Sequence, residues 1–290
     1  MVSITARIMN LILQKLPESN GNYEEERERN AKTVVKPLKD IEIAERDLGG
    51  FPADYITKKG NAKGTVFYIH GGGFTTGSAK ERRSITQHIV SKRGYDCVSI
   101  NYSLAPENKW PKALEDCLKA YEEALQEGYE DLILMGESAG GTLALSLGLL
   151  LKEKGLPLPK AIVAYSPCTD QAEDLPSHRG NIKTDYMLKG MVAKGLTTVL
   201  FDHEPTMEEL KDPYISPYYG DYEGLPKIFL AVSDSETLYD DSVVLYEKLK
   251  KEGHEVSLSV KHGVPHAYPM FPFMREAKET LDETFAFLEE

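Results

Sequence analysis

Short apolar runs alternate with longer segments of helical periodicity along most of this chain. Six runs have the length and composition of buried strands: residues 65–70, 97–102, 132–137, 161–166, 228–233 and 256–260. Between them, apolar residues recur every three or four positions, which is typical of helices with one buried face. One such stripe consists of Leu114, Leu118, Tyr121 and Leu125. Strands that alternate with helices predict βαβ crossovers, and therefore an α/β fold whose mainly parallel sheet carries helices on both faces.

The N-terminal part of the chain has a different pattern. Residues 41–48 and 51–57 flank two glycines and predict a β-hairpin. Before them, apolar residues at helical spacing predict an amphipathic helix over residues 4–16. Its interspersed polar residues and the lack of a small-residue cleavage site argue against a signal peptide. Residues 18–32 include the charged run EEERER and are predicted to form a solvent-exposed linker or helix face.

One connection interrupts the alternation of strands and helices. About sixty residues separate the strand ending at Ser166 from the one starting at Ile228, where two to six are usual. An insertion at the carboxyl ends of parallel strands lies where such sheets bind ligands, so we expect a lid here, including a helix around 187–200. The predicted organisation is an α/β core made of residues 41–170 and 216–290, and a helical cap made of residues 1–40 and 171–215.

Composition narrows the classes of function. The chain has 290 residues, 41% of them hydrophobic, and a formal net charge of −12. It lacks a cluster of Lys and Arg, which argues against nucleic acid or an anionic membrane as partner. No apolar stretch approaches the roughly 20 residues of a membrane span. The sparse cysteines Cys97, Cys117 and Cys168 fit a reducing compartment, so we expect a cytoplasmic protein.

The strongest local signal for chemistry is the G-x-S-x-G pattern at residues 136–140. It directly follows a predicted strand and precedes the apolar helix TLALSLGLLL. In this context a strained turn lifts the serine hydroxyl clear of the sheet, and the flanking glycines relieve crowding. The pattern therefore predicts Ser138 as a nucleophile.

A glycine triplet predicts the groups that stabilise negative charge. His70-Gly71-Gly72-Gly73-Phe74 follows another predicted strand. Without Cβ atoms, the backbone N–H groups of this loop are able to approach a ligand closely. Together with the N–H of Ala139, they are suited to bind the oxyanion of an acyl-transfer reaction.

A base and an acid would have to complete the site. His266 lies in a loop directly after the last predicted strand, at the same sheet edge as Ser138, with His262 as its competitor. The remaining histidines, except His70, are predicted to be surface residues. The loop after strand 228–233 offers several carboxylates, and position alone does not choose among them: Asp234, Glu236, Asp240 and Asp241. The chain order Ser, acid, His is that of α/β-hydrolases.

Four motifs taken together resemble the hormone-sensitive-lipase-like family of carboxylesterases. They are HGGGF, GESAGG, YSLAPE at 102–107 and GVPHAY at 263–268. The similarity runs from about residue 45 to the C-terminus, with the motifs in this order and spacing. The resemblance implies an α/β-hydrolase fold with an eight-stranded sheet, a cap built from the N-terminal region and an insertion, and catalysis without a cofactor or metal. It also suggests that Glu107 braces the oxyanion loop.

The resemblance also implies roles for individual residues. Ser138 would be the nucleophile and His266 the base, and the oxyanion hole would consist of the N–H groups of Gly72, Gly73 and Ala139. Family members usually carry Asp-Pro-Leu-x-Asp at the acid, and this chain has ETLYD at 236–240. Aligning the following helix places Glu236 at the acid position, with Asp234 as the alternative.

Substrate choice is less determined by the sequence. The resemblance implies short- to medium-chain acyl esters, among which acetyl esters are one candidate, and a possible homodimer. Four residues are expected to line the substrate pocket: Phe74, Tyr186, Met187 and Met191. Two rival functions share the fold, namely a small amidase and a catalytically inactive receptor. An inactive receptor of this fold typically lacks the triad histidine, which this chain retains as His266.

Overall fold

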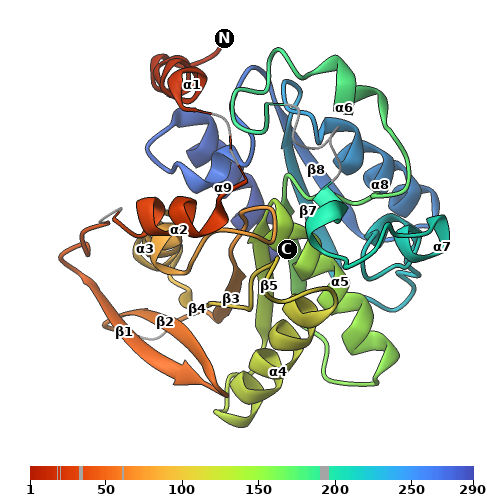
Figure 1. Ribbon diagram of the computed structural model, residues 1–290. Helices are drawn as coiled ribbons and strands as arrows, with labels where there is room; N and C mark the ends of the chain where they lie inside the picture. Colours follow the sequence, from red (N-terminus) through yellow and green to blue (C-terminus); the bar gives the residue numbers. More distant parts are fainter. Residues whose placement is uncertain (18, 20, 33–34, 61, 190–195) are drawn as a thin grey trace.

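A computed structural model describes residues 1–290 except 18, 20, 33–34, 61 and 190–195. Its centre is an eight-stranded sheet in the order β1-β2-β4-β3-β5-β6-β7-β8 (Figure 1). The strands are β1 (Ile41–Leu48), β2 (Phe51–Lys58), β3 (Thr65–Ile69), β4 (Asp96–Ile100), β5 (Leu132–Glu137), β6 (Ala161–Tyr165), β7 (Lys227–Ser233) and β8 (Val256–Lys261). β2 pairs antiparallel with β1 and with β4, and β3 to β8 are parallel. The predicted hairpin and the predicted mainly parallel sheet are confirmed.

Helices cover both faces of the sheet because alternate strand residues point to opposite sides. The major helices are α3 (Arg83–Arg93), α4 (Lys112–Gln126), α5 (Ala139–Glu153), α8 (Tyr239–Lys251) and α9 (Arg275–Glu289). Within β3, Phe67 and Ile69 join the apolar core under α4, α5 and α8. Val66 and Tyr68 join the core under α3 and α9. The period of two along a fully buried strand therefore builds two cores.

The N-terminal region forms two helices, α1 (Ile4–Lys15) and α2 (Tyr23–Ala31). α1 contacts α9 and buries Ala6 in a small cluster with Val264 and Tyr268 of the loop that carries His266. Leu13 is buried as well, but most of the larger apolar side chains of α1 are exposed, namely Ile4, Ile8, Leu11 and Ile12, and so is Leu16 directly after the helix. α2 lies across the front of the molecule near the carboxyl end of β3 (Figure 1).

The long connection between β6 and β7 contains short elements only, as far as the structure describes it. These are α6 (Pro176–Gly180), η3 (Leu196–Val199), α7 (Met207–Leu210) and η4 (Pro217–Tyr219). Two more 3-10 turns are η1 (Lys80–Arg82) and η5 (Tyr268–Met270). An α-helix was predicted around residues 187–200. The residues described at the two ends of this range do not form one, because 186–189 are a turn and 196–199 a 3-10 helix. Among the described helices, none has the length and apolar character to cross a membrane.

Candidate active site

Ser138 occupies the sharp turn between β5 and α5. Its backbone has φ 56° and ψ −127°, which a non-glycine residue adopts only under constraint. A hydrogen bond from its N–H to the carbonyl of Tyr165 helps to hold the turn (2.8 Å). A Cβ at Gly136 would lie 2.3 Å from the carbonyl oxygen of Gly140, and one at Gly140 would lie 2.1 Å from that of Ile69. The motif's glycines are therefore required by backbone packing.

The glycine-rich loop after β3 lies beside this turn. Gly72, Gly73 and Phe74 all have positive φ angles, of 127°, 60° and 62°. The backbone N–H groups of Gly72, Gly73 and Ala139 have no hydrogen-bond partner within the described part of the chain, and all three residues line one cavity with Ser138. The loop thus presents donors where the sequence predicts an oxyanion hole.

A buried carboxylate anchors the glycine-rich loop to the turn that carries Ser138. Glu137, next to Ser138, accepts hydrogen bonds from the Gly71 N–H (2.6 Å), the Tyr68 hydroxyl (2.6 Å) and the Arg82 guanidinium. The ion pair with Arg82 compensates the buried charge of Glu137. Sequence reasoning did not assign a role to Glu137 or Arg82. The only sequence feature that pointed to Glu137 was its place at the first variable position of the G-x-S-x-G motif.

His266 lines the same cavity as Ser138, and its ring faces Glu236. His266 Nδ1 lies 3.5 Å from Glu236 Oε1, and both side chains are buried. The second oxygen of Glu236 accepts a hydrogen bond from the Ser166 hydroxyl (3.0 Å), which in turn accepts one from the Ala267 N–H (3.1 Å). Neither ring nitrogen of His266 has a hydrogen-bond partner in the described regions, so His266 is hydrogen-bonded neither to Glu236 nor to Ser138. Catalytic hydrogen bonds often shorten only when substrate binds.

The other candidate acids are engaged elsewhere. Asp234 contacts exposed His262 (2.6 Å) and the N–H of Gly263. Asp240 accepts a hydrogen bond from the Ser177 N–H (2.7 Å). Asp241 is buried against His178 (2.7 Å) and the N–H of Thr169. The geometry thus brings Glu236 and no other of the four to His266, and the prediction that His178 is a surface residue is wrong.

Burial and nearby charges shift the pKa values of both His266 and Glu236. Burial alone would lower the pKa of His266, but the nearby carboxylates of Glu236, Asp185 and Glu137 favour the imidazolium, and the pKa lies above the usual 6.5. Burial raises the pKa of Glu236, and its pairing with His266 opposes that rise. The arrangement stabilises a positive charge on His266, which a general base acquires during reaction.

Asp185 is a further buried carboxylate near His266 and, like Glu137, was not predicted from the sequence. One of its oxygens accepts hydrogen bonds from the N–H groups of Met187 (3.1 Å) and Leu188 (2.9 Å). The other accepts from the N–H and hydroxyl of Thr237, at 2.8 and 2.9 Å. Asp185 therefore ties a turn of the insertion to the residue after Glu236. Nothing in its sequence context distinguishes it from a surface residue.

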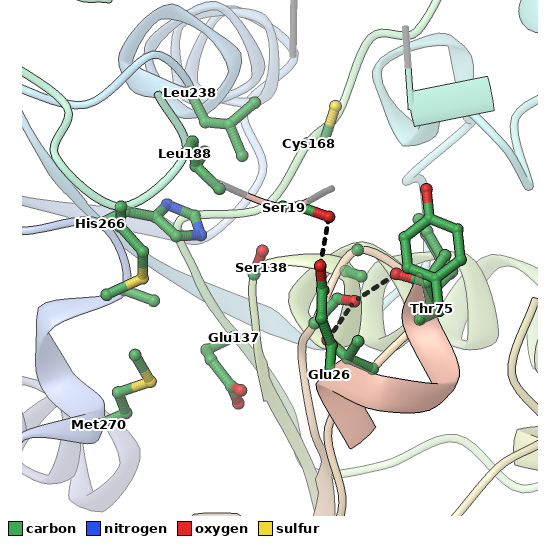
Figure 2. A pocket seen from close by; sticks show the side chains of 18 of the residues that line it. Ser19, Glu26, Thr75, Glu137, Ser138, Cys168, Leu188, Leu238, His266 and Met270 are labelled. Atoms are coloured by element: carbon green, nitrogen blue, oxygen red, sulfur yellow. Dashed lines mark hydrogen bonds between the residues drawn. The ribbon is translucent and has the colours of Figure 1, made fainter. Parts of the chain in front are cut away.

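The cavity above Ser138 has a volume of about 170 Å³. Figure 2 shows Ser138 between His266 on one side and Ser19 and Glu26 on the other. Of the predicted pocket residues, Phe74 and Met187 line the cavity, Tyr186 is not among its described lining residues, and Met191 lies outside the described residues. The lining residues not predicted include Leu188, Leu238, Cys168 and Met270.

The charged N-terminal segment also differs from its prediction. Arg27 of α2 donates to the carbonyls of Thr75 (2.6 Å) and Ala105 (2.5 Å), and it pairs with Glu107 (2.9 Å). Glu26, next to it, lines the cavity. The segment is therefore part of the site and not only a solvated linker. Glu107 is linked to the loop after β3 through Arg27, which bonds to Thr75 of that loop.

Comparisons with known proteins agree with this geometry. Residues 66–270 match the family described as alpha/beta hydrolase fold. An esterase from Acinetobacter venetianus is 30% identical over 252 residues, covering 85% of this chain and 82% of the relative. An acetyl-hydrolase from Streptomyces hygroscopicus is 28% identical over 245 residues, covering 83% and 80%. The crystal structure of an esterase from the bacterial hormone-sensitive lipase family superposes with a TM-score of 0.88 at 28% identity, covering 99% of this chain and 98% of that one.

The chain therefore belongs to the α/β-hydrolase family, and within it to the hormone-sensitive-lipase-like esterases. It is a carboxylic ester hydrolase. The fold and the family expected from the four motifs are confirmed.

Proposed function

We propose that this protein hydrolyses short- to medium-chain carboxylic esters through an acyl-enzyme on Ser138. The observation that carries the proposal is the convergence of Ser138, His266 and three unpaired backbone N–H groups on one cavity. In the proposed reaction, Ser138 Oγ attacks the ester carbonyl while His266 takes its proton. Glu236, on the far side of the imidazole, holds the ring and stabilises its positive form.

The backbone donors act on the charge that develops next. The carbonyl oxygen becomes an oxyanion, and the N–H groups of Gly72, Gly73 and Ala139 bind it. His266 then gives its proton to the leaving alkoxide, and the alcohol departs. Water attacks the acyl-enzyme through the same relay, with His266 as base, and releases the acid.

The cavity supports a preference for small acyl groups. A cavity of about 150 Å³ holds a molecule as large as benzene, and the cavity here is of similar size, about 170 Å³. That space suits acetyl to butyryl groups better than long chains. The acetyl-hydrolase among the relatives agrees with an acetyl ester as one substrate.

We also propose that residues 1–40 and 171–215 act as a cap on the core formed by residues 41–170 and 216–290. Ser19, Tyr23 and Glu26 from the first segment and Met187 and Leu188 from the second line the cavity. Side chains from both segments thus shield the nucleophile from solvent, which strengthens the electrostatic interactions of the site.

A reducing compartment, and hence a cytoplasmic location, is the setting that we propose. The three cysteines of the sequence are free and buried. Burial raises the pKa of each thiol, which keeps it protonated and inert.

The proposal is tested with p-nitrophenyl acetate, butyrate and octanoate and with the p-nitroanilide of butyrate. We expect the wild type to favour acetate or butyrate and to leave the anilide uncut, and Ser138→Ala to lose activity by at least about ten-thousandfold. Glu236→Gln should fall by about ten-thousandfold, because the imidazole loses its orienting charge. Asp234→Asn, the matched control, should stay within about twofold of the wild type, since Asp234 faces His262.

Two results would overturn the proposal. Faster cleavage of the anilide than of the ester would make the protein an amidase. Absence of turnover on every ester, with tight binding of one of them, would make it a receptor.

A further inference from the structure

The cavity has a charged wall that the proposed ester hydrolysis does not use. Glu26 and Tyr23 are three residues apart on α2, so their side chains share one face of the helix. Both are half-buried and both line the cavity that contains Ser138. The Glu26 carboxylate accepts a hydrogen bond from the Ser19 hydroxyl (2.6 Å) and lies on the side of Ser138 opposite His266 (Figure 2).

The position of Glu26 is fixed by its neighbour Arg27. The Arg27 guanidinium is bound to two backbone carbonyls and to Glu107, so α2 is fastened directly over the oxyanion loop. With α2 held this way, the residue before Arg27 is directed into the cavity. Acidic residues in the first turn of a helix are common because they favour the helix dipole. The dipole accounts for Glu24 and Glu25, which remain exposed, but it does not require Glu26 to face the nucleophile.

The charge of Glu26 has no cationic partner within the described residues. Arg82 also lines the cavity, but its guanidinium pairs with Glu137. Arg27 pairs with Glu107. The wall around Glu26 therefore carries a net negative charge, next to the aromatic ring of Tyr23. An aromatic ring attracts an ammonium group through the cation–π interaction, and a nearby carboxylate adds Coulombic attraction.

We propose that Glu26 and Tyr23 form a subsite for a positively charged nitrogen, so that the enzyme prefers esters carrying an ammonium group over neutral esters of the same shape. This inference rests on the proposed esterase function and adds a substrate class to it. The ester carbonyl is placed by Ser138 and the oxyanion loop, and the ammonium group lies along α2. An anionic group at the same place would be repelled by Glu26.

The test uses pairs of esters that differ only in charge. The first pair is acetylcholine and 3,3-dimethylbutyl acetate, with the charge in the alcohol. The second pair is p-nitrophenyl 4-(trimethylammonio)butanoate and p-nitrophenyl 5,5-dimethylhexanoate, with the charge in the acyl group. For each pair, kcat/KM is measured for the wild type, for Glu26→Gln, and for Glu28→Gln, which removes the same charge from an exposed position of the same helix.

We expect the wild type to prefer the cationic ester in at least one pair by about tenfold. Glu26→Gln should abolish that preference by lowering kcat/KM for the cationic ester more than for its neutral partner, so that the ratio of the two falls to about one, whereas Glu28→Gln should retain the wild-type ratio. Equal preferences in wild type and Glu26→Gln, or a loss of preference in Glu28→Gln as well, would overturn the subsite. Both results presuppose turnover of the neutral esters. A wild type that hydrolyses no neutral ester would instead refute the proposed function.

Discussion

Replacing Arg27 by Met tests whether α2 orients the oxyanion loop. Met keeps most of the aliphatic length and removes the guanidinium, and with it the hydrogen bonds to Thr75 and Ala105 and the ion pair with Glu107. Hydrogen bonds from a charged donor contribute about 1.5–3 kcal/mol when buried. The ion pair adds little, because the Glu107 side chain is 55% exposed and such pairs give about 0–1 kcal/mol.

Two such hydrogen bonds set an upper limit of about 3–6 kcal/mol on the loss in the docking of α2, and the 27% exposure of the Arg27 side chain reduces it. Part of this loss appears as local undocking and not as global unfolding. Thr75 lies two residues after Gly73, so a freed loop places its N–H donors less well. Since complete loss of one oxyanion donor costs about a hundredfold in kcat, partial misplacement should cost about tenfold.

The assay is steady-state hydrolysis of p-nitrophenyl butyrate by Arg27→Met, Arg27→Lys and Arg29→Met, with thermal unfolding measured alongside. Arg29→Met is the control, since it changes an exposed arginine of the same helix. An oxyanion effect lowers kcat with KM nearly unchanged, because the oxyanion exists only in the transition state. A kcat within twofold of the wild type, with only KM or the melting temperature changed, would refute the reasoning and leave Arg27 as a fastening of the cap.

Three further predictions concern the base, the loop and the cavity. The kcat/KM of the wild type should rise with pH as His266 deprotonates, with a midpoint above 6.5. Asp185→Asn should move this midpoint to lower pH, because it removes a negative charge that favours the imidazolium. An unchanged pH profile would contradict an electrostatic influence of Asp185 on His266. Gly72→Ala should lower kcat by at least about a hundredfold, since its Cβ would lie 2.2 Å from the Thr76 carbonyl oxygen. Gly60→Ala, at a similar φ of 123° with open space around it, should leave kcat unchanged, and equal losses in the two variants would argue against a special role for the loop. Leu188→Ala should enlarge the cavity and raise the octanoate-to-acetate ratio of kcat/KM by about fourfold for each additional methylene group that the cavity then holds. An unchanged ratio would show that Leu188 does not contact the acyl chain.

The sheet and the nucleophile turn were predictable because their constraints are local. Short apolar runs define most of the strands, and the glycines at 136 and 140 are required where backbones approach within van der Waals contact. The carboxyl ends of β5 and of the parallel strands β7 and β8 then bring Ser138, Glu236 and His266 to one edge. Among the acids, sequence position alone did not suffice, and the family resemblance was needed to favour Glu236.

The parts contributed by the cap were not predictable from periodicity. α2 has no apolar stripe, and its docking depends on hydrogen bonds from Arg27 to carbonyls that exist only once two distant loops have folded. In α1 the periodicity predicts a helix correctly but not its buried face. The side chains that pack are Ala6 and Leu13, whereas the apolar stripe that includes Ile8 and Ile12 is exposed.

The most direct test of the account is irreversible labelling with a sulfonyl fluoride, followed by mass mapping of the modified peptide and measurement of residual esterase activity. The account predicts that activity falls in proportion to the sulfonylation of Ser138, and that Ser138→Ala is both inactive and unlabelled. Esterase activity retained by Ser138→Ala, or inactivation by modification of a different residue, would contradict it.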